Sequence, residues 1–246
     1  MYILAIETTG AFASVALMED DRLMGHVKGN DRFSHLQNLM PQVEEVTRNN
    51  QLQIGDIDAI AVSCGPGSFT GIRIGVSSAR ALAQILDIPC VAVSSLEALA
   101  MRAAGTEADI TADAEDRVLI CPILDARRSQ VYGAGYYLEN GFPKEEIKAG
   151  PYTIEEFLEK AVLYERILLL GDAADVCSEK IKLLRPEGTE TAPEDIRYQD
   201  AVTVAELGRK LLAETGGVKY SDVKPEYMRI AEAERKLREK QAQQKV

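Results

Sequence analysis

The stretch Cys64-Gly-Pro-Gly-Ser-Phe-Thr-Gly-Ile-Arg-Ile-Gly75 is the most unusual segment of this 246-residue chain. It follows an apolar run at residues 57–62 that has the composition of a buried strand. It leads into a helix that we expect over about residues 71–86. The glycines and the proline are typical of a tight turn between a strand and a helix. The stretch therefore predicts an α/β protein in which this strand and this helix pack closely.

The same glycines also invite comparison with phosphate-binding loops, because free backbone amides at a helix N-terminus attract anions. The P-loop pattern requires GK[ST], but Ile72 follows Gly71 here. The dinucleotide pattern GxGxxG fails by one residue, since Thr70 stands where the third glycine belongs. The nucleophile elbow GxSxG is absent from this stretch as well. A purely structural turn and an anion-binding turn both remain open from the residues alone.

Small residues recur along one side of the expected helix. Gly71, Gly75 and Ala79 are spaced four residues apart and share one face, which another backbone can approach closely. The flanks are apolar, and the polar positions are confined to one stripe of Arg73, Ser77, Arg80 and Gln84. Such a helix is buried on most sides, either wholly within the chain or partly against another protein.

The remaining sequence predicts a duplicated topology. Apolar runs at 2–6, 13–18 and 23–28 predict a β-meander, followed by a helix from Ser34 and by the strand, turn and helix described above. After the acidic stretch 105–116 the order recurs, with strands expected at 118–124, 130–138 and 144–148, then a helix, a strand at 166–170 and a helix. Capping-box patterns mark two of these helix starts, at Thr153 with Glu156 and at Thr203 with Glu206.

These patterns predict two α/β lobes of βββαβα topology. We expect the first lobe over residues 1–105 and the second over 106–230, and the helix near 203–214 is a candidate to rejoin the first lobe. Residues 231–246 carry five Lys or Arg against three Glu and no apolar stripe. We expect them to form a charged C-terminal tail.

Composition narrows the classes of function. Hydrophobic residues make up 46% and charged residues 27% of the chain, which is typical of a folded soluble protein. No apolar run approaches the roughly 18 residues of a membrane helix, and Glu7 interrupts the first one. The net charge of −11 disfavours a protein that binds nucleic acid with its own surface. The four cysteines lack metal-type spacing and indicate reduced thiols in a cytoplasm.

Few residues are candidates for catalysis or for binding a metal or phosphate. Cys64 is a candidate nucleophile or a buried thiol, and only His26 and His35 could serve it as a base. These two histidines are nine residues apart, so local sequence builds no His-pair metal site. The triplet Glu7, Thr8 and Thr9 ends an apolar strand, where an acid with hydroxyl neighbours suits phosphate and magnesium, but where a structural turn is equally expected.

Five segments together resemble the TsaB (YeaZ) family. They are ILAIETT at 3–9, SHLQNLMP at 34–41, CGPGSFTGIRIG at 64–75, DARRSQVY at 125–132 and PEYMR at 225–229. The resemblance spans the chain up to about residue 229. It implies the ASKHA fold of actin and Hsp70, with two lobes of βββαβα topology.

The resemblance also implies that this chain is not itself an enzyme. The related catalytic transferase TsaD has two metal-binding histidines after its fourth strand, where this chain has Ser95 and Leu99. The second lobe lacks the nucleotide turn and has Gly171-Asp172-Ala173-Ala174 instead. We therefore expect no catalytic residue, no metal and no nucleotide cofactor in this chain, and Glu7, Thr8 and Thr9 would be a vestigial phosphate loop.

By the same resemblance, the chain would bind and stabilise TsaD during threonylcarbamoylation of the adenosine next to the anticodon of tRNA. Other expected partners are the ATPase TsaE and, without TsaD, a second copy, whereas tRNA would be contacted only through the complex and a membrane not at all. The expected interface consists of Leu36, Leu39, Met40, Val43, Gly71, Ile72, Arg73, Gly75, Val76, Ala79 and Arg80. The alternative is a self-contained ASKHA-type nucleotide-binding hydrolase that uses the Glu7 triplet.

Overall fold

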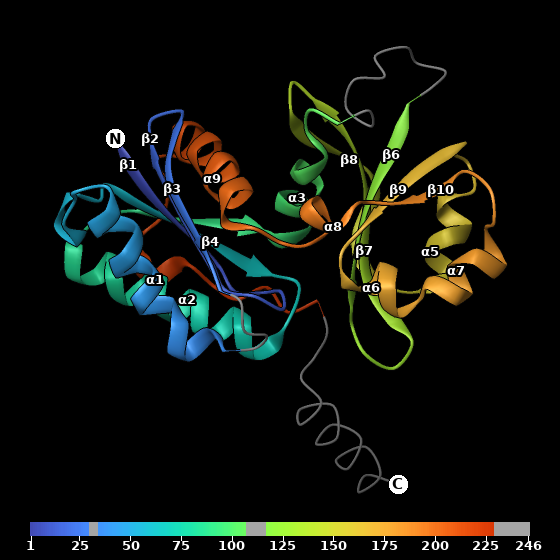
Figure 1. Cartoon of the computed structure of the whole chain (residues 1–246), viewed down its shortest axis with the longest axis horizontal. Coiled ribbons are helices and arrows are strands. Elements are labelled where there is room, and N and C mark those ends of the chain that lie inside the picture. Colours follow the sequence, from blue (N-terminus) through green and yellow to red (C-terminus); the bar gives the residue numbers. More distant parts are fainter. Residues whose placement is uncertain (30–33, 107–116, 229–246) are drawn as a thin grey trace, which may run out of the picture.

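The computed structural model describes residues 1–29, 34–106 and 117–228, so the expected tail over 231–246 lies outside the described residues. The chain forms two lobes, each with a five-stranded sheet (Figure 1). The first sheet has the order β3-β2-β1-β4-β5, with β1 at Tyr2–Glu7, β2 at Ser14–Glu19, β3 at Arg22–Lys28, β4 at Ala59–Gly65 and β5 at Cys90–Ser94. The second has the order β10-β9-β6-β7-β8, with β6 at Val118–Asp125, β7 at Gln130–Glu139, β8 at Phe142–Thr153, β9 at Arg166–Leu170 and β10 at Thr189–Thr191.

The two sheets share one topology. In the first, β1 pairs antiparallel with β2 and parallel with β4. In the second, β6 pairs antiparallel with β7 and parallel with β9. Each lobe then gains a fifth strand, β5 or β10, parallel to its neighbour. A three-stranded meander followed by parallel strands is thus present twice, which confirms the predicted two-lobed α/β fold with a duplicated topology.

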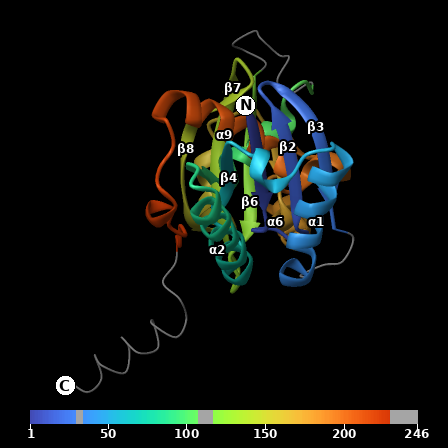
Figure 2. The same cartoon turned by 90° about the vertical axis from the view of Figure 1, so that its left-hand side faces the viewer.

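Helices cover both faces of the first sheet. The helices α1 (His35–Asn49) and α2 (Phe69–Leu86) pack side by side on one face (Figure 2), and α9 (Ala201–Thr215) packs on the other. Successive residues of β1 point to opposite faces of the sheet. Leu4 and Ile6 pack in the core under α1 and α2, whereas Ile3 and Ala5 pack in the core under α9. A strand buried on both faces is a continuous apolar run, as residues 2–6 are.

The second sheet is also covered on both faces. The helices α5 (Ile154–Ala161), α6 (Asp172–Val176) and α7 (Ser178–Leu184) pack on one face around Phe157. On the other lies α3 (Ser95–Ala100), and the short helix α8 (Glu194–Arg197) follows β10. Single 3₁₀ turns occur at Ile54–Asp56, Met101–Ala103 and Tyr220–Asp222. Within the described ranges, every helix is too short or too polar to cross a membrane.

Two helices are exchanged between the lobes. The helix α3 directly follows β5 of the first sheet, but its Leu96 and Leu99 join the core of the second sheet. Conversely, α9 follows the second sheet in sequence and packs on the first. A division of the chain at residue 105 would therefore separate α3 from the sheet that it covers. The chain crosses between the lobes at both helices, and this ties the two cores together.

Helix starts agree only partly with the capping patterns. Thr153 and Glu156 form the predicted reciprocal capping box at the start of α5. The box predicted at Thr203 and Glu206 is wrong, because the N-cap of α9 is Asp200, three residues before Thr203. The Asp200 carboxylate accepts a hydrogen bond from the Val202 amide. Asp200 also lies 3.2 Å from His26 and 3.6 Å from Lys28, so the acid connects α9 to β3.

The small-residue face of α2 packs inside the first lobe. A Cβ atom added at Gly71 would lie 1.9 Å from the Thr8 carbonyl oxygen, and one added at Gly75 would lie 2.3 Å from the Thr8 hydroxyl. The Thr8 hydroxyl also donates a hydrogen bond to the Gly71 carbonyl at 2.8 Å. The turn after β1 therefore rests directly on the backbone of α2.

We predict that Gly71→Ala destabilises the chain, although alanine is the better helix former. The helix propensity of alanine would stabilise α2 by about 1 kcal/mol, but overpacking against the Thr8 carbonyl costs about 1–3 kcal/mol or more. Urea denaturation should show a lower free energy of unfolding for Gly71→Ala. The matched substitution Ser77→Ala, at an exposed position of the same helix, should not lower it. An unchanged or raised value for Gly71→Ala would contradict the close approach.

Candidate functional site

The turn after β1 is held by hydrogen bonds between its own residues. Glu7 is fully buried, and its Oε1 atom accepts hydrogen bonds from the Thr9 amide at 2.5 Å and the Thr9 hydroxyl at 2.6 Å. Its second carboxylate oxygen, Oε2, is buried without a hydrogen-bond partner in the described chain. Burial raises the pKa of Glu7, which the two hydrogen bonds from Thr9 oppose. The carboxyl group therefore supports the turn and does not face solvent.

A second turn covers the first. The Ser68 amide donates a hydrogen bond to the Thr9 carbonyl at 2.8 Å, and a Cβ atom at Gly67 would lie 2.6 Å from that same oxygen. Ser68 is also the N-cap of α2, where its hydroxyl accepts the Gly71 amide. The glycine-rich stretch is thus a tight strand-to-helix turn, as one of the two interpretations predicted. It packs against the Glu7 triplet and leaves Thr9 alone of the three at the edge of a cleft.

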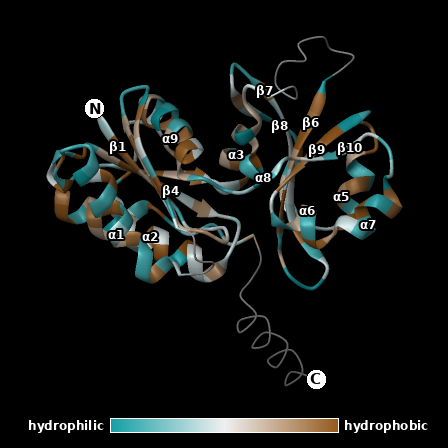
Figure 3. Ribbon diagram, in the orientation of Figure 1, coloured by the Kyte–Doolittle hydropathy of each residue, from teal (hydrophilic) through white to brown (hydrophobic). Residues whose placement is uncertain are grey.

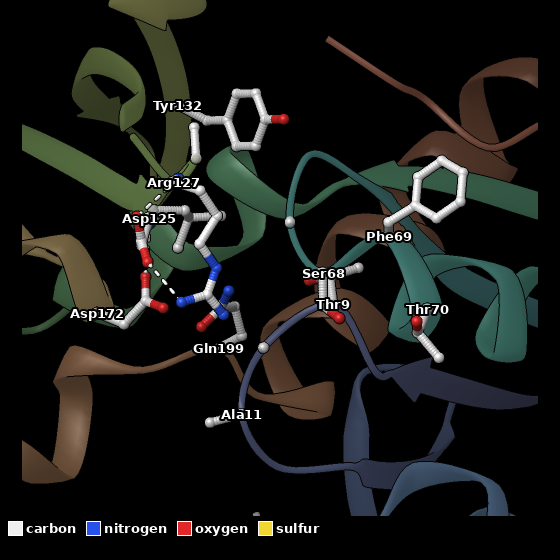
Figure 4. Close-up of a pocket in the computed structure, with 14 residues that line it drawn as sticks. Thr9, Ala11, Ser68, Phe69, Thr70, Asp125, Arg127, Tyr132, Asp172 and Gln199 are labelled. Carbon is white, nitrogen blue, oxygen red and sulfur yellow. Dashed lines mark hydrogen bonds and ion pairs between the residues drawn. The ribbon is translucent and has the colours of Figure 1, made fainter. Parts of the chain in front are cut away.

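That cleft lies between the two lobes and has a volume of about 270 Å³. Figure 4 shows Thr9, Ser68, Phe69 and Thr70 along one wall and Asp125, Arg127, Tyr132 and Asp172 along the other. Gln199, from the segment before α9, completes the lining together with Ala11. Neither Glu7 nor Thr8 lines it.

The second-lobe wall is held by its own polar contacts. The Asp172 carboxylate accepts the Asp125 amide at 2.9 Å, and burial followed by the nearby Asp125 charge raises the pKa of Asp172. The Arg127 guanidinium lies 3.2 Å from the Asp125 carboxylate. Arg127, Arg128 and Ser129 all have left-handed backbones, with φ of 64°, 57° and 60°. Three such residues cost about 1–2 kcal/mol each, so this turn is locally strained, and the Arg127 side chain at the edge of the cleft is 80% exposed.

Ser95 and Leu99, which the resemblance places where TsaD has metal ligands, both take part in packing. The Ser95 hydroxyl is buried and donates a hydrogen bond to the Pro66 carbonyl, and Leu99 is fully buried in the core around α3. Across residues 1–29, 34–106 and 117–228, no group of three or more His, Cys, Asp or Glu side chains is placed to hold a metal ion.

Cys64 is a core thiol. It is buried in the same cluster as Ile72 and Val76, and burial raises its pKa to about 12. A thiol that stays protonated at neutral pH is a poor nucleophile. The nucleophile interpretation therefore lacks physical support, and the buried-thiol interpretation fits.

The residues predicted at a partner interface divide into two groups. Seven of the eleven are buried in the chain's own core: Leu39, Val43, Gly71, Ile72, Gly75, Val76 and Ala79. In the chain by itself these seven lie on the inner faces of α1 and α2. Leu36, Met40 and Arg73 are exposed and Arg80 is half-buried, so contact through these four remains a prediction.

Part of the cleft lining comes from segments that the sequence singled out, namely Thr9, Ser68 to Thr70 and Asp172, whereas the other residues were not expected at a site. Asp125 and Arg127 belong to a segment that served only for the resemblance, and Gln199 belongs to no motif. A signal was nevertheless present in the duplicated topology. The turn between β6 and β7 is the second-lobe counterpart of the turn between β1 and β2, and in this fold the two turns face one another across the cleft.

We predict that Glu7→Gln raises the free energy of unfolding at neutral pH. Because burial raises the pKa of Glu7 above its ordinary 4.5, the folded chain releases this proton at a higher pH than the unfolded chain. The contribution of Glu7 to stability changes in the pH window between these two pKa values. Stability from this group therefore falls as pH rises through that window. Glutamine keeps the acceptor oxygen for Thr9 and cannot ionise.

Urea denaturation from pH 4 to pH 8 would check this, with Glu45→Gln on the exposed side of α1 as the control. The difference between Glu7→Gln and wild type should grow as pH rises, and the control should show no such trend. A variant that is less stable than wild type at neutral pH would show that Glu7 is needed as a carboxylate.

The chain is similar in sequence to proteins of tRNA threonylcarbamoyladenosine biosynthesis. The family model described as "TsaD: tRNA N6-adenosine threonylcarbamoyltransferase" matches residues 32–236. The tRNA threonylcarbamoyladenosine biosynthesis protein TsaB of Bacillus subtilis is 35% identical over 98% of this chain and 100% of its own length. TsaB of Escherichia coli is 36% identical over 70% of this chain and 68% of its own.

Solved structures agree. The structure of YeaZ from Pseudomonas aeruginosa superposes with a TM-score of 0.77 at 25% identity, covering 92% of this chain and 99% of that one. Sequence and fold therefore agree over nearly the whole chain, from the meander of the first lobe to the segment before the tail. The chain belongs to the TsaB (YeaZ) family of tRNA threonylcarbamoyladenosine biosynthesis proteins.

Proposed function

We propose that this chain is a non-catalytic subunit that binds and stabilises the transferase TsaD during threonylcarbamoylation of tRNA adenosine. Its relatives are named as biosynthesis proteins of threonylcarbamoyladenosine, and the matching family model carries the name of the transferase itself. A chain that has the fold of the transferase, but serine and leucine where the transferase has metal-binding histidines, suits the role of a partner and not of the catalyst.

The exposed apolar surface of α1 and α2 carries this proposal. Leu36 on α1 is 78% exposed and Ile85 on α2 is 80% exposed, and Met40 is also exposed. Hydrophobic and hydrophilic segments alternate along both helices in Figure 3. An apolar hollow lies beside them and is lined by Met40 and Val43 from α1, Leu82 from α2 and Leu52 and Ile54 from the connection after α1.

The exposed side chains of this surface are of the type that anchors a protein contact. Burying a leucine or an isoleucine side chain stabilises a complex by about 1.5–3 kcal/mol. Leu36 and Met40 lie one turn apart on α1, and Met40 also lines the adjoining hollow, so these side chains form an apolar patch of the type found in protein interfaces. The polar rim includes Arg80 on α2 and Glu44 and Arg48 on α1.

The closed turn supports a non-catalytic role for the chain on its own. An ATPase of this fold needs the end of β1 open to phosphate, whereas here Glu7 is bonded to Thr9 and Ser68 packs over the turn. In the proposed complex, the catalytic metal and nucleotide belong to partner subunits. TsaE would join the same assembly, tRNA would be reached through it, and a second copy could cover α1 and α2 when TsaD is absent.

We predict that Leu36→Glu combined with Ile85→Glu weakens binding to TsaD by at least tenfold, because two buried apolar contacts become charged. Tenfold corresponds to about 1.4 kcal/mol, which is less than the burial of one such side chain. Isothermal titration calorimetry with purified TsaD would measure the change. Both side chains point to solvent in the free chain, so its stability should be retained.

The matched control is Leu163→Glu combined with Leu183→Glu, two side chains of the second lobe that are 86% and 82% exposed. This pair should bind TsaD as the wild type does. If the control pair weakens binding and the first pair does not, the interface lies on the second lobe and the proposed surface is wrong.

A further inference from the structure

Arg73 is an exposed arginine of α2 that has no acidic partner in the described part of the chain. Within residues 1–29, 34–106 and 117–228 its guanidinium group makes no ion pair. The helix α2 itself contains two arginines and no acidic residue. The chain as a whole has a net charge of −11, so this cation lies uncompensated on the surface of an acidic protein.

Two aromatic side chains hold this arginine in one orientation. Its guanidinium carbon lies 3.9 Å from the centre of the Phe69 ring, and its Nε atom donates a hydrogen bond to the Tyr227 hydroxyl at 3.0 Å. The centres of the two rings are 4.7 Å apart. Stacking on one ring and hydrogen bonding to the other side chain restrict the rotamers of an otherwise flexible arginine.

Tyr227 reaches α2 because the C-terminal strap, residues 218–227, is fixed to the first lobe along its length. Val218 forms an antiparallel bridge to β5. Val223 is 1% exposed and packs in the same core cluster as the inner face of α2. The Glu226 amide then donates a hydrogen bond to the Cys64 carbonyl at 2.8 Å. The position of the Tyr227 hydroxyl is therefore set by the fold and not by a free chain end.

The outer edge of the guanidinium group is left open. Only the Nε atom of Arg73 has a hydrogen bond among the described residues, so the two terminal nitrogens are available. These nitrogens form a planar fork that matches the two oxygens of a carboxylate. Because the side chain is already oriented, binding a carboxylate there loses less rotamer entropy than binding by a free arginine.

The open arginine lies on the same helix as the apolar surface proposed for TsaD. Arg73 and Ile85 are both exposed on α2, and twelve residues correspond to about 18 Å along a helix. A standard interface of about 800 Å² per partner is roughly 30 Å across. One partner can therefore cover both residues. Phe69 and Tyr227 are 37% and 40% exposed, and aromatic residues and arginine are the types that interfaces favour.

We propose that Arg73 is a polar anchor of the TsaD surface and that its fork binds a carboxylate side chain of TsaD. This inference rests on the proposed subunit function and adds the chemistry of one contact. Phe69 and Tyr227 are positioning residues, which act on TsaD through the arginine. The C-terminal strap thus contributes to partner binding by orienting a side chain of α2.

Calorimetric titration of the full chain with TsaD tests the anchor. Arg73→Gln should weaken binding by about tenfold or more, because the partner carboxylate loses a charge-assisted pair of hydrogen bonds. Arg73→Lys keeps the charge but loses the planar fork, and should still bind about threefold more weakly than wild type. The control Lys182→Gln removes the same charge from a side chain of the second lobe that is 76% exposed, and should bind as wild type does.

A double-mutant cycle tests the role of the strap. Tyr227→Phe keeps the ring on Phe69 and removes only the hydroxyl that bonds Arg73, and should weaken TsaD binding by about threefold or more. In the Arg73→Gln background the same change should have no further effect. An equal loss in both backgrounds would show that the hydroxyl does not act through Arg73. Thermal melting of each variant checks that it is folded.

The outcomes separate this inference from the function on which it rests. If Leu36→Glu with Ile85→Glu weakens binding and Arg73→Gln does not, the anchor is wrong while the subunit role stands. If Arg73→Gln changes only the self-association of the chain in gel filtration, a second copy occupies the fork and the assignment to TsaD is wrong. If wild type does not bind TsaD at all, both proposals are overturned.

Discussion

The first lobe depends on the contact between the turn after β1 and the backbone of α2. Thr8 rests on Gly71 and Gly75 at distances that exclude any side chain, and its hydroxyl bonds the Gly71 carbonyl. Ser68 then closes over Thr9 from the other side. This approach of two backbones fixes where α2 begins and which of its faces points inward. It also fills the space at the end of β1 with protein atoms, so Glu7 is buried and bonded to its own turn.

The outer features of the molecule follow from this constraint. With its glycine face turned inward, α2 presents Ile85 and the Arg80 stripe outward beside α1, and there Leu36 and Met40 add the apolar surface proposed for TsaD. The first turn of α2 meanwhile faces the second lobe, where Arg127 and Gln199 meet it across the cleft. One helix thus lies between the face proposed for partner binding and a small polar cleft. The exchanged helices α3 and α9 hold the two lobes together around that cleft.

Much of the fold was predictable from the sequence because local patterns decide it. The run Ile3 to Ile6 is apolar on both faces, as a central strand must be. Thr153 and Glu156 form a capping box between residues only three positions apart, so the sequence shows it directly. The neighbour of Gly75 and Ala79 was not predictable, because a small-residue face has the same sequence pattern whether it packs on another protein or, as here in the chain by itself, on the chain's own β1. The N-cap at Asp200 and the cleft residue Gln199 were not predictable, since their partners lie in the first lobe, far away in sequence.

The central claim is that this chain acts by binding a catalytic partner through the first lobe. The most direct measurement is a calorimetric titration of the chain with TsaD from the same organism, followed by gel filtration of the mixture. The account predicts saturable one-to-one binding and a single heterodimer peak that replaces any homodimer of the chain. Absence of binding, with and without nucleotide and TsaE, would contradict it and would return the Glu7 turn and the interlobe cleft to the centre of the search for function.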